Sequence, residues 1–476
     1  MRACELFEGT LISEDFEVSG IFTDSRKIIP NSVFVCLKGT EENGHQYANE
    51  AAERGARLIV AEEEISAPVQ VIYKESTVEA LSELAERFYG YPADKLKLIG
   101  VTGTNGKTTV TFLIKSILEA AGQKTGVIGT NKCFVGDEEL DFESNMPTTP
   151  NSLELAYIFS EMQKRGAKYV AMEVSSHALA LKRVNGLKFD IGVFTNLSRD
   201  HLDFHKTMED YAKTKAKLFD MTAAAVINTD SGTGLKIAAA CKCPVVTVGL
   251  NEDADISASQ ICLGGDYVSF VCTENETPRN LRLGIPGKFS VYNALCAVGT
   301  ARALGIDYDD IKAGLAAVSN VKGRVELVPT DTDYKVFIDY AHSPDGLLNI
   351  LNTAKGFTKG RVIAVFGCGG DRDITKRPVM GKIAGDLADF SVITSDNPRC
   401  ENPVKIIEEI KEGIDRTAGE YIIIVNRREA IEYALKNAKK GDTVLLCGKG
   451  QETYQIIGKK KYHFDEREII KEILNK

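Results

Sequence analysis

Several features that mark other classes of protein are missing from this chain. No stretch of its 476 residues approaches the roughly 18 consecutive apolar residues of a membrane-spanning helix, so we expect no membrane insertion. The chain has no long run of basic residues and its formal net charge is -9, which argues against a nucleic-acid-binding surface. Internal repeats and low-complexity tracts are also absent. Small molecules are therefore the expected partners.

The cysteines show no pattern of disulfide bonds or zinc ligands. All 11 are scattered along the chain, and the closest pair, Cys241 and Cys243, lacks a second pair at zinc-ligand spacing. Free thiols in a reducing compartment fit this distribution best. Residues 1–9 include acidic side chains where a secretory signal would carry its apolar core. We therefore expect a cytoplasmic protein, and we expect it to be a monomer.

The chain is too long for one hydrophobic core of the usual size, and we expect three domains. Its composition, with 43% hydrophobic and 26% charged residues, is typical of a globular protein. Turn-forming residues at 91–94 and a Lys-Gly-Arg sequence at 322–324 mark candidate boundaries. The predicted domains span residues 1–97, 98–324 and 325–476.

A candidate phosphate-binding loop lies near the start of the second domain. An apolar run leads into Gly103-Thr-Asn-Gly-Lys-Thr-Thr109, which is followed by apolar residues at helical spacing. The loop N–H groups and the positive end of the helix should face one anion, Lys107 should reach the outer phosphates, and a threonine hydroxyl should bind Mg²⁺. The standard motif requires glycine where this chain has Val101, and an ordinary turn with a chance lysine is the alternative. We favour nucleotide binding because strand, loop and helix are in register.

The sequence predicts an α/β fold. In the second domain, short apolar runs alternate with helical patterns and have the length of buried parallel strands, which predicts a mainly parallel sheet covered by helices. Strand-like alternation at 256–286, with turns at 264–265 and 275–276, predicts an added antiparallel patch. The expected strands of the main sheet are 97–102, 125–130, 168–174, 189–195, 224–228 and 244–248.

The two outer domains are also predicted to be α/β. Residues 1–97 combine short strands with two helical patterns. The segment Thr23–Arg26 fits a polar turn and a ligand contact equally well. The last domain alternates strands and helices in a Rossmann-like manner. Its Gly367–Arg372 segment is not a G-x-G-x-x-G sequence, so a dinucleotide is not indicated. Its expected strands are 335–339, 361–367, 390–394, 421–425 and 442–447.

Polar residues collect where two strands of the second domain end. Glu173, Ser175 and His177 follow one strand, and Asp200 with His201 follows the next. Ligands of parallel sheets bind at such ends, and an acid opposite a phosphate loop is a usual ligand of Mg²⁺. Each residue alone could instead be an ordinary structural histidine or a helix-capping acid. Their combination favours a site.

Lys215 occupies an unusual position in a predicted helix at 208–219. Lys213 and Lys217 are four residues apart and share one face, whereas Lys215 lies on the apolar side with Tyr211. We predict that Lys215 is buried. A buried ammonium is costly unless it is paired, neutral or chemically altered. In the alternative, only the apolar stem of Lys215 is buried and its amine reaches water.

Together these segments resemble the Mur ligase family over essentially the whole chain. The resemblance also involves Asn293, Gly323-Arg324 and Asp339-Tyr-Ala-His342, which occur in the family's order. It implies an ATP- and Mg²⁺-dependent enzyme of peptidoglycan precursor synthesis that forms an amide bond through an acyl phosphate. Asp396-Asn-Pro-Arg399 resembles the sequence of members that add meso-diaminopimelate to UDP-N-acetylmuramoyl-L-alanyl-D-glutamate, and lysine-adding members lack its arginine.

The resemblance also implies roles for individual residues. It assigns to ATP Gly103, Thr104, Asn105, Gly106, Lys107, Thr108, Thr109, Asn293, Arg324 and Asp339. It assigns to the UDP-linked substrate Ser25, Thr148, Thr149, Ser175 and Arg183. It assigns to diaminopimelate Arg372, Asp396, Asn397, Pro398, Arg399, Gly448 and Glu452. It assigns catalytic roles to Lys107, Glu173, His201 and Lys215. It assigns Mg²⁺ binding to Thr108, Glu173, His201 and a carbamylated Lys215.

One position departs from the family. Leu181 stands where some members have a glutamine that contacts the substrate. The remaining alternatives are a lysine-adding ligase, a folylpolyglutamate synthase with a similar central domain, and a P-loop switch or transport ATPase. An arginine fork such as that of Arg399 suits a carboxylate, and diaminopimelate differs from lysine by one carboxylate. This favours diaminopimelate as the substrate.

Overall fold

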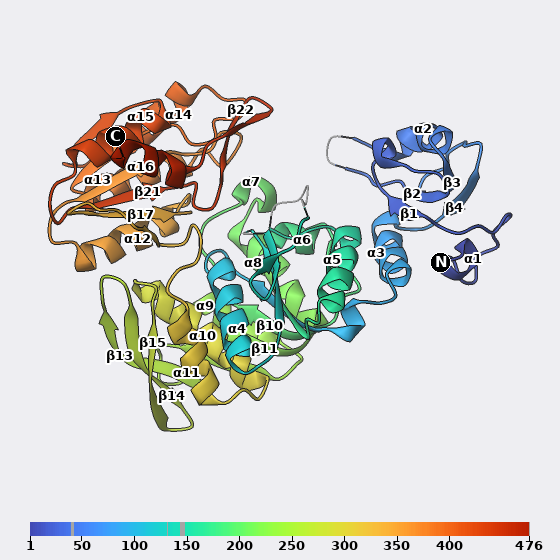
Figure 1. The fold of residues 1–476 in the computed structure, drawn as a ribbon, viewed down its shortest axis with the longest axis horizontal. Helices are drawn as coiled ribbons and strands as arrows, with labels where there is room; N and C mark the ends of the chain where they lie inside the picture. The colour runs from blue at the N-terminus through green and yellow to red at the C-terminus, as the bar shows by residue number, and fades with distance from the viewer. Residues whose placement is uncertain (40–41, 131, 143–147, 476) are drawn as a thin grey trace. The chain divides into compact units, whose positions relative to one another are not determined.

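The computed structural model describes residues 1–39, 42–130, 132–142 and 148–475 (Figure 1). The chain forms two compact units. Unit 1 comprises residues 1–100, 123–190 and 221–223, and unit 2 comprises residues 101–122, 191–220 and 224–476. Among the described residues, no helix is both long enough and apolar enough to cross a membrane.

The amino-terminal part of unit 1 is a four-stranded parallel sheet with strands in chain order. Alternate residues of its strands face opposite sides, so Val33 and Val35 pack with α1 and α3 while Phe34 packs on the side of α2. Both faces are thus buried, as parallel sheets require. The elements are α1 (Ala3–Leu6), β1 (Gly20–Phe22), β2 (Ser32–Val35), α2 (Ala48–Glu53), β3 (Ala56–Ala61), β4 (Gln70–Tyr73) and α3 (Thr77–Phe88).

The rest of unit 1 contains a parallel pair of strands and an antiparallel extension. β6 (Thr125–Gly129) pairs in parallel with β9 (Tyr169–Glu173). β7 (Lys132–Val135) and β8 (Glu138–Glu139) continue from β6 as antiparallel strands, which the sequence had not indicated. The helices are α5 (Ser152–Lys164), which begins with a capping box between Asn151 and Glu154, and α6 (Ser176–Ala180).

The strands from residue 224 onward lie in unit 2. β11 (Thr222–Asn228), β12 (Val245–Gly249) and β13 (Ile256–Leu263) pair in parallel. β13, β14 (Val268–Glu274) and β15 (Thr277–Leu283) then form the antiparallel patch, and both predicted turns are confirmed. The other elements are β10 (Phe189–Phe194), α4 (Lys107–Ala120), α7 (Leu202–His205), α8 (Met208–Ala216), α9 (Gly232–Ala240), α10 (Lys288–Ala303) and α11 (Tyr308–Ala317). β5 (Lys97–Thr102), β10 and β11 each pass from one unit into the other.

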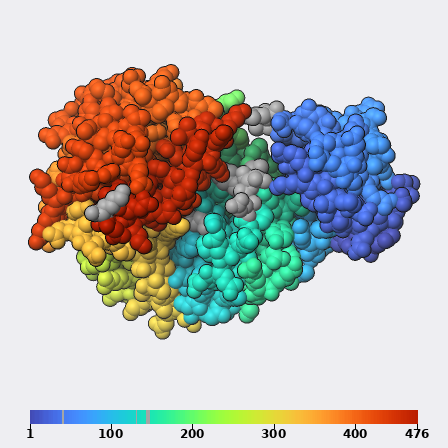
Figure 2. Space-filling view, turned by 45° about the horizontal axis from the view of Figure 1, so that its top comes forward, coloured from blue at the N-terminus to red at the C-terminus, as the bar shows by residue number. Residues whose placement is uncertain are grey.

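The carboxyl-terminal part of unit 2 is a six-stranded sheet in the order β16-β17-β21-β18-β19-β20, and with its helices it forms one continuous block, orange to red in Figure 2. Only β16 is antiparallel to its neighbour. The strands are β16 (Glu326–Val328), β17 (Lys335–Asp339), β18 (Val362–Phe366), β19 (Phe390–Ile393), β20 (Tyr421–Ile423) and β21 (Thr443–Cys447), with a separate hairpin of β22 (Tyr454–Ile457) and β23 (Lys460–His463). The helices are α12 (Pro344–Phe357), α13 (Lys376–Leu387), α14 (Pro403–Ile414), α15 (Arg427–Asn437) and α16 (Glu466–Leu474).

The strand order in this sheet reverses in the middle. After β17 the chain forms β18, β19 and β20 in order toward one edge of the sheet, and it then returns to form β21 between β17 and β18. In open α/β sheets, ligands bind at the carboxyl ends of strands near such a reversal. The loops at 367–372, 394–401 and 448–452 follow β18, β19 and β21. These loops carry every residue that the sequence assigned to diaminopimelate.

Candidate active site

The phosphate loop follows β5 and has the backbone that its glycines permit. Gly103 and Gly106 have φ angles of 149° and 88°, which L-residues with a side chain rarely adopt. A Cβ on Gly103 would lie 1.9 Å from Thr195 Oγ1, and one on Gly106 would lie 2.3 Å from Asn293 Oδ1. The two glycines therefore allow a close approach that no other residue would. Asn293, predicted to contact ATP, lies directly against the loop.

Residues after β10 hold the loop in place. Asn105 donates its N–H to Asn196 Oδ1 at 3.0 Å, and Thr195 Oγ1 donates to the carbonyl of Asn105 at 2.6 Å. Thr104 accepts the N–H of Ser198 at 3.0 Å. The loop is thus braced from the strand end where the sequence had placed polar residues, and its shape is set before a ligand arrives.

Two lysines converge on one carbonyl of this loop. Lys107 Nζ donates to the carbonyl oxygens of Gly103 and Thr104 at 3.0 and 2.9 Å, and Lys215 Nζ donates to that of Gly103 at 2.8 Å. Lys215 is 1% exposed, which confirms the predicted burial, and its amine lies 4.5 Å from the ring centre of Tyr211. Among the described residues, no carboxylate forms an ion pair with it. Burial and the nearby charge of Lys107 hold the pKa of Lys215 well below its ordinary value, although Asp200 acts in the opposite direction.

Arg324 lies beside the same loop, and Asp339 contacts the segment that carries Arg324. Arg324 Nη2 donates to Thr108 Oγ1 at 3.0 Å, and its guanidinium stacks 4.7 Å from the ring centre of Tyr340. Asp339 Oδ2 accepts the N–H of Val325 at 2.7 Å. Burial raises the pKa of Asp339, while the charge of Arg324 opposes that rise. The structure thus brings Asn293 and Arg324 to the loop, and Asp339 to the segment that carries Arg324.

His201 stands next to a largely buried acid, Asp200. Its backbone is left-handed, with φ 55°, and its Nε2 lies 3.6 Å from Asp200 Oδ2. The same carboxylate oxygen lies 3.7 Å from His342 Nε2. Burial alone would raise the pKa of Asp200, but His342, His201 and Lys376 outweigh burial and hold the pKa well below its usual range. Among the described residues, no cluster of three or more His, Cys, Asp or Glu side chains is placed to hold a metal ion.

Unit 1 gathers most residues predicted for the UDP-linked substrate around Glu173. Glu173 is 1% exposed, and its carboxylate accepts a hydrogen bond from the backbone N–H of Thr130 at 2.8 Å. The backbone carbonyl of Glu173 accepts from Thr149 Oγ1 at 2.9 Å. Thr149 Oγ1 also accepts the N–H of Ser175 at 3.0 Å. Arg183 Nη1 donates to the carbonyl of Thr149 at 3.3 Å.

Three further residues of unit 1 bear on the predicted substrate contacts. Thr148 shares a hydroxyl hydrogen bond of 3.0 Å with Thr130, next to Glu173. Leu181, which stands where some family members have a substrate-contacting glutamine, is 40% exposed. Ser25 lies on a different element, a short helical turn before β2, where its hydroxyl donates to Glu50 Oε2 at 3.1 Å.

The carboxyl-terminal loops bring two arginines together. Arg399 has φ 48°, and its Nη1 donates to the carbonyl of Gly370 at 2.7 Å. Arg372 Nη1 donates to the carbonyl of Asp371 at 2.8 Å. Burial and the positive charge of Arg372 lower the pKa of Arg399, whereas Asp396 and Glu452 act against that change. The described hydrogen bonds of these two guanidinium groups go to backbone carbonyls, which are neutral. The two neighbouring positive charges can therefore bind a carboxylate ligand.

The other residues predicted for diaminopimelate form one hydrogen-bonded group. Asn397 Nδ2 donates to Glu452 Oε2 at 2.8 Å. Asp396 Oδ2 is buried and has no hydrogen-bond partner among the described residues, and a Cβ on Gly448 would lie 2.4 Å from it. Pro398 separates this group from Arg399 in the chain.

The sequence missed the buried charges beneath this group. Lys449 and Arg427 have fully buried side chains, and Arg427 Nε binds Glu466 Oε1 at 2.8 Å. Arg377, also fully buried, bridges Glu401 and Glu409 and braces the loop of Arg372 by donating to the carbonyl of Gly369 at 3.3 Å. The one signal that could have pointed to Lys449 is its place between two glycines, directly after an apolar strand.

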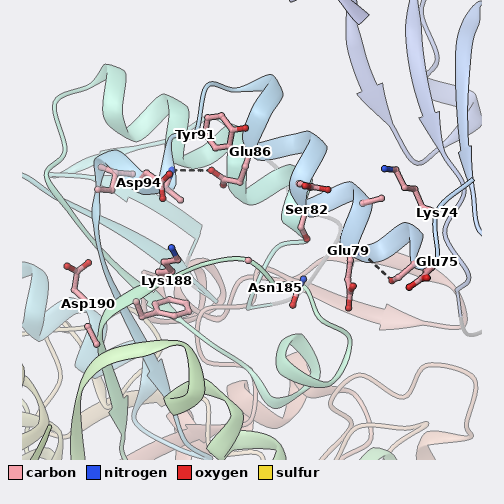
Figure 3. Close-up of a pocket in the computed structure, with 18 residues that line it drawn as sticks. Lys74, Glu75, Glu79, Ser82, Glu86, Tyr91, Asp94, Asn185, Lys188 and Asp190 are labelled. Atoms are coloured by element: carbon pink, nitrogen blue, oxygen red, sulfur yellow. Dashed lines mark hydrogen bonds between the residues drawn. The ribbon is translucent and has the colours of Figure 1, made fainter. Parts of the chain in front are cut away.

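A cavity of about 800 Å³ in unit 1 does not belong to the predicted site (Figure 3). It lies along α3, and its lining includes several acids, among them Glu79, Glu86 and Asp190. Leu96, also in its lining, directly precedes β5, whereas the phosphate loop follows that strand. No residue assigned to a substrate by the sequence lines the cavity.

A glycine-rich loop at the carboxyl end of a strand, followed by an open α/β domain with polar loops at its own strand ends, is typical of multidomain nucleotide-dependent enzymes. Models of three Mur ligase domains match the chain: the Mur ligase family catalytic domain at residues 17–89, the middle domain at 101–301 and the glutamate ligase domain at 323–450. The chain belongs to the Mur ligase family, and it is an ATP-dependent ligase of three domains.

Relatives match over the full length. A protein of Caldanaerobacter subterraneus subsp. tengcongensis, named UDP-N-acetylmuramoyl-L-alanyl-D-glutamate--2,6-diaminopimelate ligase, is 48% identical over 100% of this chain and 99% of its own. A protein of Clostridium botulinum with the same name is 44% identical over 96% of this chain and 95% of its own. A solved structure of a ligase of that name is 30% identical, with a TM-score of 0.69 over 99% of this chain and 98% of its own. MurF from Acinetobacter baumannii, 18% identical with a TM-score of 0.69 over 98% of this chain and 95% of its own, shares the fold.

Proposed function

We propose that this enzyme joins meso-2,6-diaminopimelate to UDP-N-acetylmuramoyl-L-alanyl-D-glutamate, with cleavage of ATP to ADP and phosphate. The observation that carries the proposal is the pair Arg372 and Arg399 beside Asp396 and Asn397, in a chain whose full-length relatives at 44–48% identity bear that name. The γ-phosphoryl group of ATP passes to the terminal carboxylate of the dipeptide. An amine of diaminopimelate then attacks this acyl phosphate, the amide bond forms and phosphate leaves.

The phosphate loop binds the polyphosphate of ATP. Its N–H groups and the start of α4 face the anion, and Lys107 moves from its two carbonyl partners to the phosphates. Arg324 adds a second positive charge close to Thr108. These preorganised donors offset the negative charge that builds up during phosphoryl transfer. Asn293 and Asp339 complete the nucleotide site in this proposal.

The side chains assigned to Mg²⁺ fit a hard cation in part. Thr108 and Glu173 offer oxygen, the donor that Mg²⁺ prefers, and His201 offers nitrogen. Lys215 fits only after modification, because an ammonium group cannot bind a cation. A neutral buried amine can attack carbon dioxide and lose a proton, and the product is an anionic carbamate. Burial and the charge of Lys107 lower the pKa of Lys215, which raises the fraction of neutral, reactive amine. When bound, Mg²⁺ supplies a Lewis acid for phosphoryl transfer.

We assign the substrates to domains as the sequence does. Residues 1–97 with Ser25 bind the UDP group, residues 98–324 bind ATP and the dipeptide through Thr148, Thr149, Ser175 and Arg183, and residues 325–476 bind diaminopimelate. The cytoplasmic location and the monomeric state stay predictions of the sequence.

The test measures phosphate release from ATP and UDP-N-acetylmuramoyl-L-alanyl-D-glutamate, with diaminopimelate, lysine, ornithine or no amino acid. Release that depends on diaminopimelate, with formation of the UDP-linked tripeptide detected by mass, supports the proposal. Preference for lysine would identify a lysine-adding ligase. Release without any amino acid would favour a simple ATPase.

A further inference from the structure

A fully buried lysine lies beneath the amino-acid site, and none of the roles assigned above includes it. Lys449 follows β21, and its Nζ donates to Asn397 Oδ1 at 3.1 Å and to Glu452 Oε2 at 3.0 Å. The same atom lies 5.9 Å from the ring centres of both Tyr454 and Phe464. The ammonium group is thus enclosed by two oxygen acceptors and two aromatic faces, a setting that suits a cation.

These contacts close a triangle of side chains. Asn397 Nδ2 donates to Glu452 Oε2 at 2.8 Å, and Asn397 Oδ1 also accepts the N–H of Ile456 at 2.9 Å. Two N–H donors therefore satisfy the amide oxygen, and this fixes the orientation of the amide. Among the described contacts, Glu452 uses Oε2 alone, so its other oxygen can accept from a ligand.

The charges around the triangle favour an ammonium ligand. Three carboxylates, those of Asp396, Glu452 and Glu466, surround the two cations Lys449 and Arg427. Counted without the adjoining Arg399, these five side chains carry one negative charge in excess, and buried charges require compensation. The adjoining arginines suit a carboxylate instead.

We propose that Lys449 is a positioning residue, which holds Asn397 and Glu452 in the orientation that receives an ammonium group of the incoming amino acid. The inference rests on the proposed function, since it specifies how that amino-acid site is built. Diaminopimelate and lysine both carry this ammonium group, whereas only diaminopimelate offers the additional carboxylate to Arg399. Lys449 therefore governs affinity for both amino acids, and Arg399 governs the choice between them.

The decisive variant is Lys449→Met, which keeps an unbranched apolar side chain between the two rings and removes the charge. We expect the KM for diaminopimelate to rise about tenfold or more, as when a buried acceptor loses its partner. The KM values for ATP and the UDP-linked dipeptide should stay unchanged. kcat/KM should fall by the same factor for diaminopimelate and for lysine supplied at high concentration. Combination with Asn397→Ala should add little further loss, because both changes break the same triangle.

Arg361→Met is the matched control. Arg361 binds Asp442 Oδ2 at 2.8 Å at the opposite ends of β18 and β21, so its loss should lower the thermal midpoint without changing the KM for the amino acid. If Lys449→Met does not fold, Lys449→Arg keeps the charge but cannot place one donor between the two oxygens, and its KM should still rise. An unchanged KM in either folded variant, or equal rises for all three substrates, would overturn the inference. Failure of the wild-type enzyme to use diaminopimelate would instead overturn the proposed function.

Discussion

Lys107 and Lys215 donate to the same carbonyl oxygen, that of Gly103, at 3.0 and 2.8 Å. Two ammonium groups on one neutral acceptor repel each other, and this repulsion adds to the effect of burial on the pKa of Lys215. The pair is relieved when Lys107 is drawn to a phosphate or when Lys215 loses its charge. Either event alone relieves the repulsion, and the lowered pKa that makes Lys215 reactive depends in part on Lys107 staying at this carbonyl.

Lys107→Ala tests the phosphate loop. We expect turnover to be lost while the fold is retained, because Lys107 neutralises phosphate charge and its described hydrogen bonds go to backbone carbonyls of the loop. Phosphate release and circular dichroism measure the two effects. Lys115→Ala, on the same helix and paired with Glu119, is the control and should stay active. Near-normal turnover in folded Lys107→Ala would refute the assignment.

Lys215 should carry a carbamate in the active enzyme. Intact mass measured under conditions that retain bound carbon dioxide should show the added mass of about 44 Da, and Lys215→Ala should be inactive but regain activity with short carboxylic acids that replace the carbamate. Lys213→Ala, on the exposed side of α8, should behave as the wild type. An active enzyme whose mass shows no modification would contradict this expectation.

The sequence predicted the order of elements well because that order depends on local patterns. Apolar runs of strand length and the positive-φ glycines of the phosphate loop are visible in the chain, and Lys215 was correctly placed on a buried face. The hairpin of β22 and β23 was missed because its second strand, 460–463, is exposed and begins with two lysines. Arg427 was missed because its partner Glu466 is 39 residues away, so its sequence resembles that of a surface helix.

Acid should weaken the buried charge group of the carboxyl-terminal domain. Burial alone raises the pKa of Asp396, but Lys449 and Arg427, with smaller effects of the Asn397 N–H and His342, bring it below the ordinary 3.8. A lowered pKa means that the unfolded chain binds more protons near that pH, so the stabilisation is present above about pH 4 and is lost as the pH falls through the folded-state pKa.

Asp396→Asn tests this dependence. Near neutral pH the substitution should cost about 3–5 kcal/mol of unfolding free energy, the range for removing one partner of a buried ion pair. The difference from the wild type should shrink as the pH falls below 4, in urea unfolding followed across that range. Asp415→Asn, an exposed carboxylate on the same domain, should show a much smaller difference. A gap for Asp396→Asn that is independent of pH would show that the charge of the carboxylate is not what stabilises the domain.

The choice of amino acid should depend on Arg399. If its guanidinium binds the distal carboxylate of diaminopimelate, Arg399→Ala should lose about 2–5 kcal/mol of binding, as when one partner of a desolvated charge pair is removed. Lysine lacks that carboxylate and leaves the arginine unpaired, so the variant should lose little activity toward lysine. The quantity to measure is the ratio of kcat/KM for diaminopimelate to that for lysine, with Arg416→Ala as a surface control whose ratio should match the wild type. If Arg399 only shapes its loop through the carbonyl of Gly370, both substrates lose equally and the ratio stays constant. A constant ratio would therefore leave selectivity to other residues, even if overall activity fell.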